Sequence, residues 1–347
     1  MTHVFHSVKV IPIIVLMISF FHCSPVINDS AVVFLVNGEP VTVTEFKLEM
    51  HQGHLAATYG YFYQKHGAQD CKDFWTSRFN RENPLEYAKE QTLAALKERK
   101  VQQIQFKKYG IRDDISFSQF QKDLKKENQH RKEALADNQV IYGPVEFQEY
   151  NYLNYCFSND LIKLKEVLAA DVFSITETDL KKHYNAVKKV KYKIPNKFNI
   201  QRLWVQEKPT AALHELFAAL LDASQKGVDF PSLAAGFSTE RFKVNYETRK
   251  FNEDTAGYDE RRFLEIKQIV ATLSLNEISG VIRNQGFLNI IKLISRETMG
   301  FYCFDKTKEN VHRDYVEKLY EHYLHDLLSR AKVKINKKVY HTITAGR

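Results

Sequence analysis

Apolar residues recur at three- and four-residue steps over several long stretches of this chain, a spacing typical of amphipathic helices. The longest such stretch follows Gly143-Pro144 and continues to Leu168. Another helix is predicted from Asn83-Pro84, a capping residue followed by proline in the first turn, to Gly110. Ser116 predicts the start of a further, strongly charged helix. The first half of the chain is therefore predicted to be mainly helical.

A short strand pair precedes these helices. Ala31–Val36 is apolar enough to form a strand, and Asn37-Gly38 predicts a tight turn after it, because both residue types tolerate positive φ. Pro40-Val41 continues the pair, and Thr42–Glu45 then has the Thr-x-x-Glu form of a capping box. A helix that carries Phe46 on its apolar side is expected to begin there.

The pattern changes after residue 195. Thr176–Asp179 caps a helix that is predicted to end before Pro195, because proline disfavours helix in the residue before it. Short apolar runs and helical segments then follow in a βαα…αββ order: a strand at 198–205, helices at 210–227, 229–236 and within 256–273, and strands at 278–283 and 288–294. This length suits a single domain. A last helix through 311–327 and a strand at 333–335 close the chain.

Length and composition fit a folded protein of two or three units and of the α+β class. The chain has 347 residues, of which 44% are hydrophobic and 13% aromatic, ample for packed cores. Its net charge of +8 suits an anionic partner such as a membrane surface or a cell-wall polymer. Nucleic acid is not expected as a partner, because the sequence contains no recognisable nucleic-acid-binding motif.

The cysteines and histidines predict no metal site and no cofactor. The four cysteines are scattered: Cys23, Cys71, Cys156 and Cys303. No two are close in sequence, so a disulfide framework is not expected, and the ligand spacings of a zinc site are absent. His51 with His54, and His322 with His325, have three-residue spacing, but no cysteine or carboxylate ligands in a known pattern accompany them.

Residues 1–24 have the form of a targeting segment. Two histidines and Lys9 supply a weakly basic start, and Val10–Phe21 is an apolar run too short to span a bilayer comfortably. A signal peptide, cleaved or retained, is therefore expected, with an extracytoplasmic location in the cell envelope or outside the cell. Cys23 is a candidate lipid-modified first residue, although Phe20-Phe21-His22 lacks the small residues of a lipoprotein cleavage site.

Three segments in the last third of the chain share their order and spacing with a known domain. They are Val228–Thr239, Leu273–Ile282 and Gly286–Leu293. Together they resemble the parvulin-type peptidyl-prolyl isomerase domain, also called the rotamase or PpiC-type domain. Val36–Thr42 near the start, and Ile175–Tyr184 before the domain, are similar to the corresponding segments of exported SurA/PrsA-type foldases.

The resemblance implies an extracytoplasmic folding factor built from two modules. Residues 25–195 and 298–347 would form a helical chaperone module, with a parvulin-like domain, residues 196–297, inserted between them. Its partners would be unfolded or nascent exported polypeptides, X-Pro segments included. Cis/trans exchange at X-Pro crosses a barrier of about 18–20 kcal/mol, which a catalyst lowers by binding the twisted amide in an apolar cleft, without metal or nucleotide.

Active parvulins carry two histidines that face each other in this cleft. The resemblance places Arg202 at the first of these positions, within Gln201–Val205, and Asn289 at the second, before Ile290-Ile291-Lys292. The glycine-rich Gly-Gly-Asp-Leu-Gly loop is also replaced, by Asn245–Phe251. We therefore expect weak or absent isomerase activity, with Arg202 and Asn289 as neighbours on a small antiparallel sheet.

Aromatic residues supply the candidate substrate contacts. Four of them in the parvulin-like segment are candidates for a proline-accepting pocket, with core packing as the other interpretation: Trp204, Phe237, Phe263 and Phe287. A second aromatic group runs from Tyr59 to Tyr63 and continues with Phe74 and Trp75. An exposed patch there would suit binding of unfolded chains, whereas a buried one would join helices.

Two further functions stay open at the level of sequence. The chain is an active isomerase with an altered cleft if Arg202 or Asn289 polarises the prolyl amide. It is a structural or assembly protein of the envelope if it serves one dedicated partner.

Overall fold

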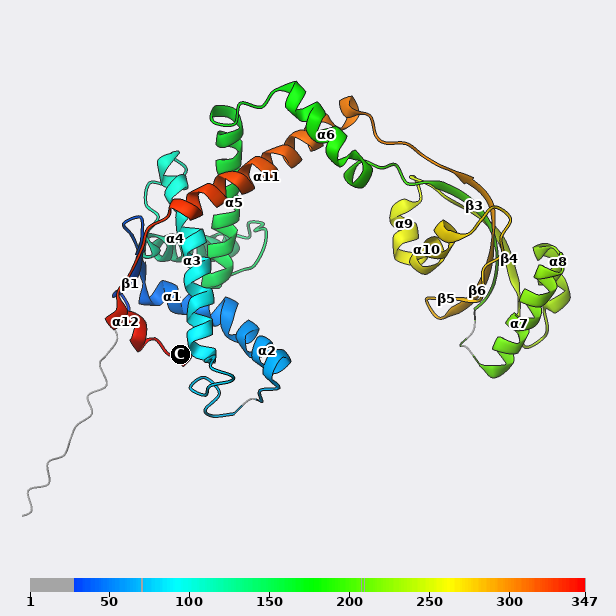
Figure 1. Cartoon of the computed structure of the whole chain (residues 1–347), viewed down its shortest axis with the longest axis horizontal. Helices are drawn as coiled ribbons and strands as arrows, with labels where there is room; N and C mark the ends of the chain where they lie inside the picture. The colour runs from blue at the N-terminus through cyan, green and yellow to red at the C-terminus, as the bar shows by residue number, and fades with distance from the viewer. Residues whose placement is uncertain (1–27, 70, 207, 209, 347) are drawn as a thin grey trace, which may run out of the picture. The chain divides into compact units, whose positions relative to one another are not determined.

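The computed structural model describes residues 28–346 except 70, 207 and 209 (Figure 1). The predicted signal peptide and Cys23 lie outside the described residues. Two compact units divide the chain: one combines the residues before Ser174 with those after Lys318, and the other is Ser174–Lys318. The predicted insertion at 196–297 lies within the second unit. In the described part of the chain, no helix is long and apolar enough to cross a membrane.

The first unit contains a three-stranded antiparallel sheet in the order β2-β1-β7. Its strands are β1 (Val32–Val36), β2 (Glu39–Thr42) and β7 (Val333–Ile335). Asn37 and Gly38 connect β1 to β2 with φ angles of 49° and 94°, which confirms the predicted Asn-Gly turn. On its other side β1 pairs with β7, with Phe34 opposite Ile335, so segments from both ends of the chain form one sheet.

Helices and the loops between them make up the rest of the first unit. The helices are α1 (Val43–Glu49), the π-helical segment η1 (Met50–His54), α2 (Leu55–His66), α3 (Pro84–Lys108), α4 (Phe117–Ala136), α5 (Glu149–Asp171), the last part of α11 (Phe304–Arg330) and α12 (Lys337–Thr342). One core joins the sheet to α1 and α3 through Phe34, Phe46 and Leu96. A second core joins α3, α5 and α11 around Phe106 and Leu164.

The predicted capping box before α1 forms only in part, because its glutamate has another partner. The hydroxyl of Thr42 accepts a hydrogen bond from the backbone N–H of Glu45 at 3.3 Å. The carboxylate of Glu45 turns to α3 instead, where Nζ of Lys100 lies 2.9 Å from its Oε1. Both charged side chains are buried, with 4% and 2% of their surface exposed. The result is an interior ion pair that no sequence pattern indicated.

A second ion pair lies one turn further along α1. Arg99 of α3 donates to the carboxylate of Glu49, and His54 lies 3.6 Å from the same carboxylate. Burial alone would raise the pKa of Glu49, but the nearby His54 and the hydrogen bond and charge of Arg99 outweigh burial and lower it. Electrostatics therefore hold α1 to α3 beside the apolar core.

The second unit is built on a four-stranded antiparallel sheet in the order β4-β3-β6-β5. Its strands are β3 (Lys197–Val205), β4 (Asn245–Phe251), β5 (Ile282–Asn284) and β6 (Phe287–Glu297). Strand β4 was not predicted from the sequence, because its run Asn-Tyr-Glu-Thr-Arg-Lys lacks the apolar alternation of a half-buried strand. Every residue of β4 nevertheless pairs with β3.

Helices cover both faces of this sheet (Figure 1). On one face α7 (Ala211–Gln225) and α8 (Phe230–Phe237) pack against Leu203 and Ile290. On the other face α10 (Leu264–Thr272), preceded by α9 (Ala256–Arg262), packs against Ile200 and Ile291. Because side chains alternate between the faces of a strand, Arg202 shares the α9–α10 face with Ile200.

The second unit also contains α6 (Glu177–Lys191) and the first part of α11. Thr176 and Asp179 form the predicted capping box at the start of α6, with each side chain bonded to the other's backbone N–H. Leu180 and Tyr184 of α6 share a core with Val311 of α11.

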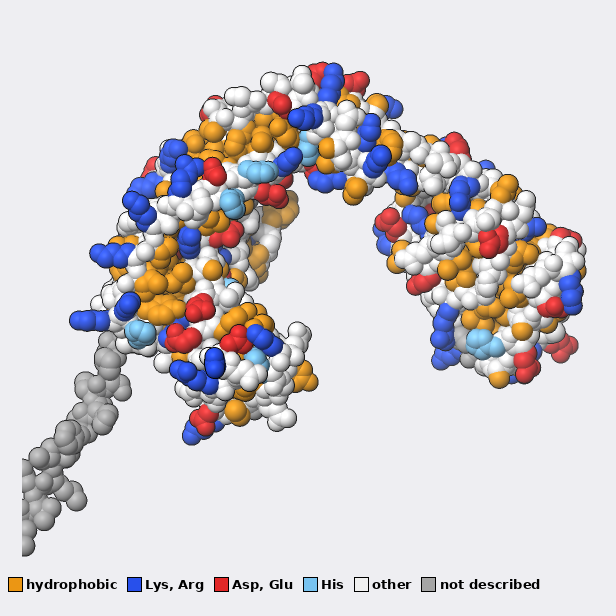
Figure 2. Space-filling model, in the orientation of Figure 1, with side chains coloured by type: hydrophobic (Ala, Val, Ile, Leu, Met, Phe, Trp, Pro, Cys, Tyr) orange, Lys and Arg blue, Asp and Glu red, His pale blue; other side chains and the backbone are white. Residues whose placement is uncertain are grey.

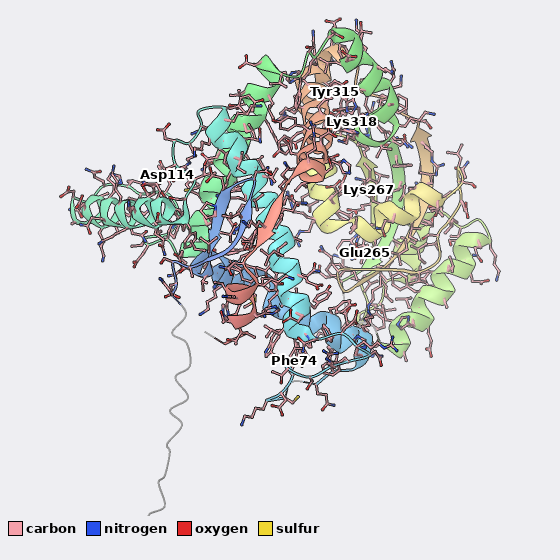
Figure 3. All side chains as sticks on the ribbon, turned by 60° about the vertical axis from the view of Figure 1, so that its left-hand side comes forward. Phe74, Asp114, Glu265, Lys267, Tyr315 and Lys318 are labelled. Atoms are coloured by element: carbon pink, nitrogen blue, oxygen red, sulfur yellow. The ribbon has the colours of Figure 1, made fainter. Side chains whose placement is uncertain are left out.

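His183 lies buried where α6 packs on α11. It is 8% exposed, and its Nε2 has no hydrogen-bond partner among the described residues. Its ring centroid lies 5.2 Å from that of Tyr315, which with Lys318 marks α11 in Figure 3. Burial lowers the pKa of His183, the positive charges of Lys318 and Lys191 lower it further, and Asp314 opposes the shift. The structure therefore favours the neutral ring.

Acidification is expected to destabilise the second unit through His183. Its folded pKa lies below its unfolded value of about 6.5, so the unfolded chain takes up a proton first as the pH falls. The stability that the neutral ring contributes is present above the unfolded pKa and is lost as the pH falls towards the folded pKa. Urea unfolding, followed by Trp204 fluorescence in a Trp75→Phe background, measures this at about pH 7.5 and about pH 5.

His183→Gln should flatten the pH dependence of unfolding relative to the parent protein. His214→Gln, a change at an exposed histidine of α7 in the same unit, is the matched control and should keep the parent's pH dependence. An equal loss of stability on acidification in the His183→Gln protein would contradict the assignment.

Candidate functional site

Arg202 and Asn289 are hydrogen-bonded to each other inside the second unit. They lie on β3 and β6, on the face of the sheet that α9 and α10 cover. Nε of Arg202 donates to Oδ1 of Asn289 at 2.7 Å. Nδ2 of Asn289 donates in turn to the carbonyl groups of Ile282 at 3.2 Å and Phe287 at 3.1 Å. The amide of Asn289 is therefore fully engaged within the fold.

A carboxylate from β4 also bonds to Arg202 and forms a three-residue network with the Arg202–Asn289 pair. Glu247 lies opposite Arg202 in the strand register and accepts a hydrogen bond from its Nη1 at 2.7 Å. Arg202 is 5% exposed and Asn289 is fully buried, whereas Glu247 keeps contact with solvent. Burial lowers the pKa of Arg202, and the hydrogen bond to Glu247 opposes that shift. Sequence analysis missed Glu247 because its strand was not recognised.

Three of the four predicted aromatic residues surround this network. The guanidinium carbon of Arg202 lies 5.0 Å from the ring centroid of Trp204 and 5.2 Å from that of Phe263. Trp204 and Phe287 meet edge to face, with their centroids 6.0 Å apart. Tyr258 of α9 extends the row, 6.0 Å from Phe263 and 52% exposed. We call Trp204, Tyr258, Phe263 and Phe287 the aromatic patch.

Phe237 does not join the aromatic patch. It lies at the end of α8, on the opposite face of the sheet, and packs against the core that contains Leu233 and Ile290. The sequence made all four aromatic residues candidates for one pocket. It does not show, however, which face of the sheet each helix covers. The structure therefore separates Phe237 from the other three.

A second, half-buried arginine fixes the patch to the sheet. Nη2 of Arg249 donates to Oδ1 of the fully buried Asp259 at 2.6 Å, and the hydroxyl of Thr255 donates to the other carboxylate oxygen. The guanidinium carbon of Arg249 lies 3.8 Å from the ring centroid of Phe263. Phe263 thus contacts the guanidinium groups of both Arg249 and Arg202, an arrangement that favours the cations electrostatically.

Neither member of the Arg202–Asn289 pair is suited to proton transfer near neutral pH. Arginine stays protonated in proteins, and an amide does not titrate. Nε and Nη1 of Arg202 and the amide of Asn289 are bonded to each other, to Glu247 and to the backbone, so a prolyl amide would have to displace those bonds to reach these atoms. The more accessible part of the site is aromatic.

The second aromatic group of the sequence forms a core. Phe62 and Phe74 are 0% and 1% exposed, and Tyr61 stacks on Tyr87 with centroids 4.5 Å apart. Figure 3 marks Phe74 in the loop that folds against α2 and α3. Tyr63, at 59% exposed, is the outward-facing member. The packing interpretation of this group therefore holds for most of its residues.

The described part of the chain contains no cluster of three or more histidine, cysteine or acidic side chains that could hold a metal ion. Cys71 and Cys303 are exposed free cysteines, and Cys156 is a half-buried one.

Neither the family models nor the curated proteins include a match to this sequence. Solved structures do match it. Among the structures to which this chain is similar are SurA-like chaperones and PrsA foldases. One is from Campylobacter jejuni and belongs to a pair described as SurA-like chaperones, PEB4 and Cj1289. It is 12% identical to this chain, and the TM-score is 0.32. The match covers 88% of this chain and 99% of that chain.

Two PrsA structures match over similar lengths. The peptidylprolyl isomerase PrsA of Bacillus cereus is 14% identical, with 91% of this chain and 98% of that chain covered and a TM-score of 0.30. The foldase PrsA of Streptococcus pneumoniae is 15% identical, with 89% and 97% covered and a TM-score of 0.25. At these values the likeness assigns no role to any residue of this chain.

Proposed function

We propose that this protein assists the folding of exported proteins by holding extended polypeptide segments on the aromatic patch, without catalysing prolyl isomerisation. The observation that carries the proposal is the network of Arg202, Asn289 and Glu247. It is internally bonded and largely buried, and it lies beside partly exposed aromatic rings. The positions at which the family resemblance expects histidines serve the fold, while the apolar surface beside them stays accessible.

The spacing of the rings suits an extended chain. Side chains on one side of an extended strand recur every two residues, at about 6.5–7 Å. The centroids of Trp204 and Phe287, and those of Tyr258 and Phe263, are each 6.0 Å apart. Proline and other apolar side chains of an unfolded segment therefore match the row, and proline-rich segments lose little entropy when they bind because they are already extended.

The clients on this proposal are unfolded or nascent exported polypeptides, X-Pro segments included. An extracytoplasmic site of action rests on the predicted signal peptide at residues 1–24 and belongs to the proposal. The partly exposed rings are the kind of apolar surface that commonly marks an interaction site on a folded protein.

Prolyl isomerase activity is the first test. In a protease-coupled prolyl peptide assay, we expect isomerisation in the presence of the protein to be no faster than the uncatalysed reaction, which takes tens to hundreds of seconds. Robust turnover that is lost on changing Arg202 or Asn289 would instead establish an active isomerase with an altered cleft.

Suppression of aggregation is the second test. Light scattering by several unrelated unfolded proteins should fall when the protein is added, and Trp204→Ser with Phe287→Ser should remove most of that protection. Tyr63→Ser is the matched control, because Tyr63 is an exposed aromatic residue of the other unit and should not matter. Tight binding of one partner, with no protection of the others, would point to a dedicated assembly protein.

A further inference from the structure

A basic surface with an apolar centre lies where the two ends of the described chain meet. An open hollow of about 630 Å³ borders β1, β7 and the start of α12. We call this surface the β7 face and define it by the residues that line the hollow: Val32, Phe34, Leu35, Lys334, Ile335, Asn336, Lys337 and Lys338. Figure 2 shows hydrophobic side chains in this region with Lys and Arg side chains around them.

The charge of the β7 face is one-sided. Lys334, Lys337 and Lys338 are exposed, and none of them forms an ion pair with the described residues. From Leu327 to Arg347 the sequence contains six Lys and Arg residues and no Asp or Glu. These lysines therefore have no acidic neighbour in sequence, and a partner with negative charge would complement them.

The centre of the β7 face is apolar and reaches solvent. Ile335 is 42% exposed, and Leu35 and Val32 are half-buried beside it. A soluble polyanion would neutralise the lysines but leave these side chains in water. The interface of an anionic bilayer accommodates both the lysines and the apolar side chains. Apolar side chains enter the boundary of the acyl region, while lysine ammonium groups stay with the lipid head groups.

The position of β1 in the chain points to the same partner. Residues 22–31 join the apolar run Val10–Phe21 to β1. Ten residues span at most about 35 Å, so an N-terminal run held in a membrane keeps β1 near the lipid. A retained segment would therefore keep β1 within about 35 Å of the lipid that holds it.

We propose that the β7 face docks on an anionic lipid bilayer, with Lys334, Lys337 and Lys338 against the head groups and Ile335 in the interface. This inference goes beyond the proposed function, because it concerns the first unit and holds whether or not the aromatic patch binds clients.

Vesicle flotation of the full-length chain tests the proposal. The apolar run Val10–Phe21 contributes equally to neutral and anionic vesicles, so the ratio of binding to phosphatidylglycerol-containing vesicles over pure phosphatidylcholine vesicles isolates the effect of charge. Lys334→Gln/Lys337→Gln/Lys338→Gln should lower that ratio about a hundredfold at low salt, because each lysine near an anionic surface contributes about 1 kcal/mol. High salt should reduce the ratio in the parent protein as well.

The matched control is Lys122→Gln/Lys125→Gln/Lys126→Gln, which makes the same change of charge on exposed positions of α4. It should leave the ratio near that of the parent protein. An equal fall in both triple variants would show an effect of net charge alone and would overturn the docking face. Unchanged urea unfolding of the first unit, followed by Trp75 fluorescence in a Trp204→Phe background, confirms that the β7-face variant folds. Unchanged suppression of aggregation keeps the two proposals separate.

A soluble polyanion or the chain's own N-terminal segment on the β7 face would each give a different experimental result. If inorganic polyphosphate binds as well as the vesicles do, and Ile335→Ser weakens neither, the partner is a soluble polyanion and the lipid proposal fails. If the triple variant at Lys334, Lys337 and Lys338 keeps its vesicle ratio but becomes more readily cut by trypsin after Lys9, the face holds the chain's own N-terminal segment, which also overturns it.

Discussion

Lys100→Met is expected to lower the free energy of unfolding of the first unit by about 3–5 kcal/mol. The change removes the ammonium group that lies 2.9 Å from the Glu45 carboxylate and leaves that carboxylate buried without a counter-charge. Chemical unfolding followed by the fluorescence of Trp75, in a Trp204→Phe background, reports the stability of this unit.

Two controls separate the buried charge from loss of packing. Glu45→Leu combined with Lys100→Met removes both charges and should recover most of the lost stability, since apolar replacement of a buried ion pair is often neutral or stabilising. Lys107 lies on the same helix as Lys100 and pairs with Glu39 at the surface. Lys107→Met should therefore lower the free energy of unfolding by less than about 1 kcal/mol. A Lys100→Met protein as stable as the Lys107→Met protein would show that the buried pair contributes little.

Asn289→Leu is expected to lower the free energy of unfolding of the second unit by about 2–3 kcal/mol. Leucine has a similar size but cannot accept the hydrogen bond from Nε of Arg202, which would stay buried with Glu247 as its remaining side-chain partner. The carbonyl groups of Ile282 and Phe287 would also lose a donor. Trp204 fluorescence during urea unfolding, in a Trp75→Phe background, measures the loss.

The combination of Asn289→Leu with Arg202→Leu tests whether the two residues act as a pair. Removing both should cost less than the sum of the single changes, because no buried guanidinium is left without its acceptor. Asn199→Ala is the matched control: this exposed asparagine of β3 bonds Ser295 at the surface, and its loss should change stability little. Strict additivity of the Arg202 and Asn289 changes would refute a coupled structural pair.

Local chemistry made much of the fold predictable. Asn37-Gly38 formed its turn, Ser116 and Asn83 capped their helices, and Thr176 formed its capping box, because each depends on residues within one turn of backbone. The contact of Arg202 with Asn289 was also expected, since the family resemblance placed both on neighbouring strands. Such features can be predicted from short sequence segments without knowledge of the tertiary packing.

Features that depend on distant partners were not predictable. The sequence of β4 is polar and does not predict a strand. The strand is held by its pairing with β3, by the bond of Glu247 to Arg202 and by the bond of Arg249 to Asp259. The burial of Lys100 likewise follows from the packing of α1 on α3, not from its own helix. Phe237 was grouped with the other aromatic residues because the sequence does not show which face of the sheet a helix covers.

The pairing of β1 with β7 imposes an order on biosynthesis. The backbone N–H of Lys332 donates to Oδ1 of Asn37 across 295 residues of sequence. A ribosome releases the amino end first, so Ser174–Lys318 emerges entirely before the partner of β1 exists, and contacts so far apart close slowly. Until β7 is released, the unpaired edge of β1 is open to other strands, and the nascent protein is itself exposed to aggregation.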